Sequence, residues 1–311
     1  WIVEHSVEQV AEKVSLVQWQ SKGRHRYKCR HRVTHRCETC QRLMGEGTTF
    51  ESTWAVPDTW QQGRGAWGGL PIRRMVEEVV QCEVSAREVR SITAQIPEPV
   101  LVGNHQVVSR LIRKGSAMSM WQVDILREQD NVTVARGQVV TGVNKNLELD
   151  PPGEAWGSAL FPHVPPAEQV ELAPVGPPFG PVFGQHLEYR PITPLPTMGT
   201  EPVVHGWINL PQRTELGAHW NAAQLLSMVD AWWPSPYTLM KTMRPVATVS
   251  FSANLLIDPI NIESIDGERS PLLHDASVSS IHGGFMSELR RLWTPDGRLV
   301  VENLQSIMVI K

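Results

Sequence analysis

Residues 222–230 read Ala-Ala-Gln-Leu-Leu-Ser-Met-Val-Asp, an almost wholly apolar helical run that ends in a carboxylate. Trp232, Trp233 and Pro234 follow it closely. An ionised carboxylate is costly to remove from water unless another group pairs with it, so Asp230 needs polar partners. The segment therefore marks a helix of the second half of the chain and the first candidate for a functional group.

The same segment belongs to an internal repeat. Three short matches support the repeat: Met75-Val76-Glu77 with Met228-Val229-Asp230, Ser91-Ile92-Thr93 with Thr248-Val249-Ser250, and Gln138-Val139-Val140 with Gln305-Ser306-Ile307. The offsets grow from 153 to 157 to 167, as expected if loops lengthened while the elements kept their order.

The predicted elements occur in the same order in both halves. In the first half we expect a strand at 49–56, a helix opening at Gly68-Gly69, and strands at about 89–96, 105–113, 117–126 and 132–142. In the second half we expect a strand at 203–210, a helix at about 220–231, and strands near 246–257, 274–281, 284–293 and 299–310. The pattern predicts an α+β fold in which a strand-helix-four-strand unit is used twice, each unit with a long helix packed on a curved antiparallel sheet.

Alternation along residues 246–255 predicts which side chains share a face of that strand. Strict period two places Thr248 with Val246 and Ser250 on one face, and Phe251 with Ala253 on the other.

Composition divides the chain into four regions. Residues 1–47 are a basic leader, expected to be poorly ordered, in which valines recur at helical spacing from Val3 to Val17. Residues 48–149 form the first unit, residues 150–202 a linker rich in proline and glycine, and residues 203–311 the second unit.

Bulk properties exclude several classes of protein. The 311 residues carry a net charge of -3, which argues against a dedicated nucleic-acid binder. No apolar run approaches the roughly 20 residues that cross a bilayer. Four cysteines are too few for a disulfide scaffold and favour a reducing compartment. We therefore expect a cytoplasmic protein, with a peroxisomal location open if the chain is incomplete.

Asp230, Thr248 and Gln305 are the candidate catalytic residues. Gln305 shares its strand face with apolar side chains, so its amide must find partners. A carboxylate, a hydroxyl and a carboxamide can together hold one water, with Asp230 accepting its proton and the other two fixing its orientation. The alternative is a helix-terminal acid in solvent, a surface threonine and a satisfied core amide.

Asp230, the strand that carries Thr248 and the strand that carries Gln305 resemble the corresponding segments of the double-hotdog type II acyl-CoA thioesterases. The resemblance spans roughly residues 48–311 and includes the helix start at Trp67-Gly68-Gly69 and the hairpin at 293–300. It implies two fused hotdog folds and hydrolysis of acyl-CoA thioesters by a water bound to Asp230, Thr248 and Gln305, without a covalent acyl-enzyme. No cofactor and no active-site metal are expected.

Two further features of the repeat leave alternatives open. The amides of Gly68 and Gly69 can polarise a substrate carbonyl oxygen, or the glycines can serve close helix-sheet packing. The repeat also aligns a first-half trio, Glu77, Ser91 and Gln138, with the candidate catalytic residues. The trio is either a second weak site or a remnant of the duplication without catalytic function. We prefer the remnant, because Glu77 lies on a polar helix face.

The leader also holds a cluster of cysteines and histidines. Its members are Cys29, His31, His35, Cys37 and Cys40. They could ligate a tetrahedral zinc ion, but the compressed spacing matches no standard finger and the flanking arginines oppose a cation. We therefore expect no metal there.

The expected partner is an acyl-CoA or a related acyl substrate, and assembly of fused units into a homo-oligomer is also expected. Two other functions remain open for the same cavity: a lyase or tailoring enzyme acting on an acyl or polyketide-like substrate, and a non-catalytic acyl-binding protein.

Overall fold

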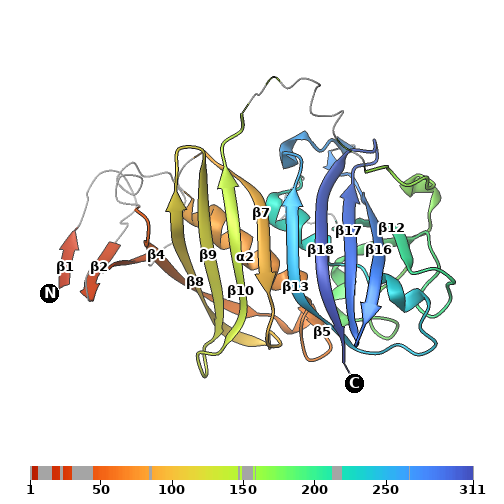
Figure 1. Cartoon of the computed structure of the whole chain (residues 1–311), viewed down its shortest axis with the longest axis horizontal. Helices are drawn as coiled ribbons and strands as arrows, with labels where there is room; N and C mark the ends of the chain where they lie inside the picture. Colours follow the sequence, from red (N-terminus) through yellow and green to blue (C-terminus); the bar gives the residue numbers. More distant parts are fainter. Residues whose placement is uncertain are drawn as a thin grey trace.

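A single large antiparallel sheet dominates the fold (Figure 1). The computed structural model describes residues 45–83, 86–145, 148, 157, 159–211, 219–265 and 267–310, and the backbone of three strands nearer the amino end. In the described part the sheet has 11 strands in the order β11-β12-β16-β17-β18-β13-β7-β10-β9-β8-β4.

The strand order repeats about the centre of the sheet. The first unit supplies β4 (Thr49–Val56), β7 (Glu88–Gln95), β8 (Gly103–Lys114), β9 (Met118–Arg127) and β10 (Thr133–Gly142). The second supplies β12 (Val203–Asn209), β13 (Val246–Leu255), β16 (Leu272–His282), β17 (Phe285–Trp293) and β18 (Leu299–Val309). Read outward from the centre, β7-β10-β9-β8-β4 corresponds to β13-β18-β17-β16-β12, so the predicted duplicated unit is confirmed.

The two units meet at the pairing of β13 with β7. Phe251 lies opposite Ala94, and Ala253 lies opposite Ile92. This reciprocal register is that of a two-fold axis between the strands, and it makes Ile92 the counterpart of Phe251. The register therefore supplies a residue-by-residue alignment of the two units.

One helix of each unit lies on the same face of the sheet (Figure 1). Helix α2 (Gly69–Cys82) belongs to the first unit and α3 (Ala222–Met228) to the second. A capping box starts α3: the Asn221 side chain accepts from the Gln224 amide, and the Gln224 side chain accepts from the Asn221 amide. With 7 residues, α3 is shorter than the expected 220–231. Bonds of the i to i+3 type tighten its end, and Pro234 lies just beyond.

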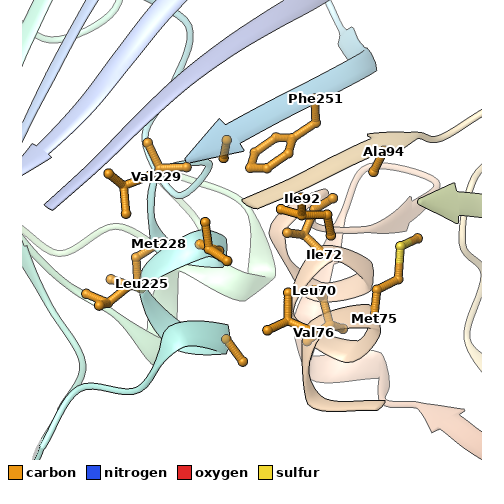
Figure 2. Close-up of a cluster of buried hydrophobic side chains, with 14 of the residues drawn as sticks. Leu70, Ile72, Met75, Val76, Ile92, Ala94, Leu225, Met228, Val229 and Phe251 are labelled. Carbon is orange, nitrogen blue, oxygen red and sulfur yellow. The ribbon is translucent and has the colours of Figure 1, made fainter. Parts of the chain in front are cut away.

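The main core fills the space between the helices and the sheet. Figure 2 shows Ile72 and Met75 of α2, Leu225 and Met228 of α3, and Phe251, whose ring projects from strand β13 of the sheet. All five side chains are at most 2% exposed. Because both helices and the central strands contribute to one cluster, the two units share a core rather than folding as separate domains.

Shorter elements lie outside this frame. They are β5 (Gln61–Gln62), β6 (Gly65–Ala66), β14 (Ser264–Ile265), β15 (Glu268–Arg269) and the 3₁₀ turns η1 (Asp58–Trp60), η3 (Ala167–Gln169), η4 (Val182–His186), η6 (Ser235–Thr238) and η7 (Pro259–Asn261). The segment expected to be a linker also adds a strand, β11 (Glu188–Pro191), at the edge of the sheet beside β12. In the described part of the chain, no helix is long and apolar enough to cross a membrane.

The leader differs from its valine spacing. It contains a three-stranded antiparallel sheet of β1 (Ile2–His5), β2 (Leu16–Ser21) and β3 (Arg24–Cys29). Val3 and Val17 lie in paired strands, so the helix that their spacing indicated is not formed there. Cys29 ends β3, and the other four cysteine and histidine residues of the cluster lie outside the described residues.

Gly137 of β10 tests the packing of α2 on the sheet. A Cβ atom there would lie 2.7 Å from Met75 Sδ and 3.0 Å from the Thr93 carbonyl oxygen. Overpacking of this kind destabilises a core by about 1–3 kcal/mol, so Gly137→Ala should lower the free energy of unfolding by that amount in urea titrations. The matched control is Gly45→Ala, where nothing lies within 4 Å. Equal stability of the two variants would contradict this packing.

Candidate active site

The turn that follows α3, residues 229–232, is buried, and side chains from other elements satisfy its carbonyl oxygens. Buried carbonyl oxygens cannot bond to bulk water and need another hydrogen-bond donor. The contacts are Trp67 Nε1 to Asp230 O at 2.9 Å, the Tyr189 hydroxyl to Ala231 O at 2.9 Å, His274 Nε2 with Val229 O at 3.2 Å, and Arg290 Nη1 to Trp232 O at 3.3 Å. Trp67 comes from the first unit, so both units hold the turn that carries Asp230.

A chain of hydrogen bonds joins the three predicted catalytic residues. Thr248 Oγ1 donates to Gln305 Oε1 at 3.1 Å, and Gln305 Nε2 donates to Asp230 Oδ1 at 2.8 Å. Asp230 is 8% exposed and Gln305 is 1% exposed. Both ends of the Gln305 amide are thus engaged, which fixes its orientation between the hydroxyl and the carboxylate.

A β-bulge brings Thr248 into this chain. Strict alternation places Thr248 on the face opposite Phe251, and that prediction is wrong. The pairing of β13 with β18 shifts between Thr248 and Ser250, so one extra residue moves Thr248 to the face of Phe251 and Gln305.

The predicted substrate-binding glycines lie against Asp230. The Gly69 amide hydrogen-bonds to the Asp230 carboxylate, and a Cβ atom on Gly68 would lie 2.7 Å from Asp230 Oδ2. At Gly69 a Cβ atom would come within 2.2 Å of the Trp67 ring. Both glycines thus permit a close approach, to a carboxylate and to an indole ring, rather than to the sheet.

A buried ion pair beside Asp230 was missed by the sequence analysis. Arg290 Nη1 lies 3.3 Å from Asp230 Oδ1, and Arg290 Nη2 lies 2.7 Å from Glu288 Oε2. Arg290 is 2% exposed and Glu288 is fully buried. Alternation along β17 offered a signal, since it places opposite charges at Glu288 and Arg290 on the apolar face of Met286 and Leu292.

Burial dominates the electrostatics of Asp230. It raises the pKa of this carboxyl above its ordinary value, while the Arg290 guanidinium and the Gln305 amide offset part of the rise. Burial also lowers the pKa of His274 to about 3, with Arg290 as a further cause, so His274 is neutral near pH 7. Asp230 is therefore a base with more proton affinity than an exposed aspartate.

Glu77, Ser91 and Gln138 do not form a matching group in the first unit. The Glu77 side chain is 35% exposed and pairs with Arg73 at 2.7 Å, while Gln138 is exposed on β10. Glu77 and Arg73 instead line a cleft of about 370 Å³ on the outer side of α2, together with Trp54, Ala55, Pro57, Trp60, Leu70, Arg74, His186 and Leu210.

The strand registers identify the true counterparts of the candidate residues. Ile92 corresponds to Phe251 and lies opposite Val139, as Phe251 lies opposite Gln305. Each pairing has its bulge at the same place, so Val89 corresponds to Thr248. The first unit therefore has valines where the second has its hydroxyl and carboxamide.

Among the described residues, no group of three or more His, Cys, Asp or Glu side chains could hold a metal ion.

Comparisons with known proteins agree with this architecture. Residues 56–142 match the family model of the acyl-CoA thioesterase N-terminal domain, and residues 163–309 match that of the acyl-CoA thioesterase C-terminal domain. The search of curated proteins found no match.

Several solved structures share the fold. A conserved hot dog fold protein of unknown function from Alicyclobacillus acidocaldarius is 18% identical, with a TM-score of 0.74 over 84% of this chain and 93% of its own. A putative thioesterase II from Thermobifida fusca is 20% identical, with a TM-score of 0.65 over 86% and 94%. The acyl-CoA thioesterase II TesB2 from Mycobacterium marinum is 13% identical, with a TM-score of 0.60 over 84% and 93%.

The fold and the paired domain matches define a double-hotdog thioester hydrolase. The chain belongs to the acyl-CoA thioesterase family, and it is a thioesterase.

Replacement of Asp230 by asparagine tests how much the buried charge of Asp230 lowers the free energy of unfolding. The folded pKa of Asp230 lies above its unfolded value, so folding must carry a buried charge once the pH exceeds both. Asp230→Asn should match wild type in stability below the unfolded pKa and become more stable as the pH rises through the folded pKa, by about 1.4 kcal/mol for each unit of difference. Urea titrations of both proteins at several pH values measure this gain, and a stability difference that does not grow with pH would contradict the assignment.

Proposed function

We propose that this thioesterase hydrolyses acyl-CoA thioesters through a water activated by Asp230. The observation that carries the proposal is the hydrogen-bond chain from Thr248 through Gln305 to Asp230, which ends on a buried carboxylate with raised pKa. A base of this kind is matched to abstracting a proton from water near neutral pH.

The two oxygens of Asp230 have different surroundings. Oδ1 accepts from Gln305 and Arg290, the Gly69 amide also hydrogen-bonds to the carboxylate, and Oδ2 points toward Gly68 at the start of α2. Oδ2 is therefore the oxygen that accepts the proton of water. The Thr248 hydroxyl gives its proton to Gln305, so its lone pairs can accept the second proton of the same water and direct the water lone pair outward.

In the proposed reaction the water oxygen forms a bond to the acyl carbon while its proton passes to Asp230. The tetrahedral intermediate then collapses with cleavage of the C–S bond. The departing coenzyme A thiolate takes the proton from the Asp230 carboxylic acid, which restores the base and leaves a free fatty or other carboxylic acid. No covalent acyl-enzyme forms.

The start of α2 is the proposed site for the thioester carbonyl. The first amides of a helix have no partner within the helix and carry partial positive charge. The Gly69 amide hydrogen-bonds to the Asp230 carboxylate, so the amide of the half-buried Gly68, beside Asp230 Oδ2, is the proposed donor. Such donors stabilise the oxyanion that develops during attack.

Release of free thiol from acyl-CoAs of different chain length tests the proposed function. Wild type should release thiol from at least one of them, and Asp230→Asn should lower kcat by at least about 100-fold because the general base is lost. The value of kcat/KM should increase with pH, and the inflection of this pH profile should lie above the ordinary pKa range of aspartate.

The matched control is Glu77→Gln, at the position of α2 that the sequence repeat aligns with Asp230. Its side chain pairs with Arg73 on the outer face of the helix, so the variant should retain wild-type kcat. Full activity of Asp230→Asn, or no thiol release by wild type from any acyl-CoA, would overturn the proposal. Substrate loss without thiol release would indicate a lyase or tailoring reaction instead.

A further inference from the structure

We infer that Arg290 is a positioning residue for the Asp230 base and that Glu288 holds Arg290 in place. This inference rests on the proposed function. It adds a pair of charged residues from β17 to the hydrogen-bond chain that reaches Asp230 from β13 and β18.

The guanidinium of Arg290 contacts both Glu288 and Asp230. The Nε and Nη2 atoms lie 2.7 Å from Glu288 Oε2, while Nη1 reaches Asp230 Oδ1 at 3.3 Å and the Trp232 carbonyl oxygen at 3.3 Å. Glu288 is itself anchored, because its Oε1 accepts from the Ser235 amide at 2.5 Å. Because a guanidinium is planar, the contacts of Glu288 with Nε and Nη2 also fix the direction of Nη1.

The neighbouring strand completes the arrangement. Glu288 lies directly opposite Gln305 in the pairing of β17 with β18, and Gln305 donates to the same Asp230 oxygen as Arg290. Two donors on Oδ1 hold the carboxylate in one orientation. Oδ2 then remains directed toward Gly68, which is the orientation that proton transfer from a bound water requires.

The first unit shows that this fold does not need an ion pair here. Val139 corresponds to Gln305 and lies opposite Trp121, so Trp121 corresponds to Glu288 and Val123 to Arg290. Trp121 and Val123 are both fully buried. Apolar residues thus serve at the same positions of the same sheet, and a buried ion pair gives little net stability over such residues. A role in orienting Asp230 accounts for the charges.

The charged and titratable groups that face Asp230 in the described structure come from three strands. They are Arg290 and Glu288 of β17, His274 of β16 and Tyr189 of β11. Helix α2, β13 and β18 present glycines, Thr248 and Gln305, which do not titrate. Burial keeps His274 neutral by lowering its pKa to about 3 and keeps Tyr189 neutral by raising its pKa well above the ordinary value. Beside the larger effect of burial, Arg290 and Glu288 are therefore the charges that shift the pKa of Asp230.

The experiment compares the pH dependence of kcat/KM for acyl-CoA hydrolysis in three variants of the full chain. Arg290→Met removes the positive charge and should move the inflection to higher pH, with kcat reduced about tenfold or more by misorientation. Glu288→Gln removes a negative charge and should move the inflection to lower pH. The matched control Arg291→Met breaks the pair of Arg291 with Glu302 on the other face of β17 and should leave the inflection unchanged.

Opposite shifts in the first two variants support the inference, because a purely structural role would lower the rate without moving the inflection. An unchanged inflection in either variant, or shifts of the same sign, would overturn it. If Arg290→Met does not fold, as judged by circular dichroism and thermal melting, the direction of the Glu288→Gln shift decides. Full activity of Asp230→Asn in the same assay would defeat the proposed function itself, whereas an inactive Asp230→Asn with an unshifted Arg290→Met would defeat only this inference.

Discussion

The active site depends on one constraint, which is the burial of the turn after α3, residues 229–232, between the two units. Carbonyl oxygens there can no longer bond to water, so side chains must satisfy them. Trp67 reaches across from the first unit, and Tyr189, His274 and Arg290 come from strands of the second half. These contacts fix the turn and, with it, Asp230. The buried carboxylate, its raised pKa and its bond to Gln305 all follow from that placement.

The duplication provides an internal comparison for the site. At four matching positions of the sheet the first unit has Val89, Trp121, Val123 and Val139, whereas the second has the half-buried Thr248 and the buried Glu288, Arg290 and Gln305. Buried polar groups cost stability unless every partner is present, so a half-polar site is disfavoured. The contrast between four apolar residues in one unit and four polar residues at the matching positions of the other is what chemistry in a single unit predicts.

Much of this could be predicted from the sequence, because hydrophobic periodicity and element order follow from local physics. The strand-helix-four-strand repeat and the boundaries of β4, β12 and β17 lie within a residue or so of expectation. Contacts between strands distant in the sequence were harder to predict. A single bulge moved Thr248 to the other face, and a slip of one residue paired Gln138 rather than Val139 with Gln305. Arg290 was missed because alternation marks a face but does not show that Asp230 lies over it. The expected homo-oligomer and domain boundaries remain predictions.

A single turnover in ¹⁸O-labelled water, with enzyme in excess over acyl-CoA, tests the central claim most directly. If Asp230 activates water, the label enters the carboxylic acid product in the first turnover and the protein stays unlabelled. Suppose instead that Asp230 attacks the acyl carbon to form an anhydride and that water opens this anhydride at its aspartyl carbonyl. The first-turnover product would then carry no label, and mass spectrometry would find ¹⁸O in the peptide that contains Asp230, which would contradict the mechanism.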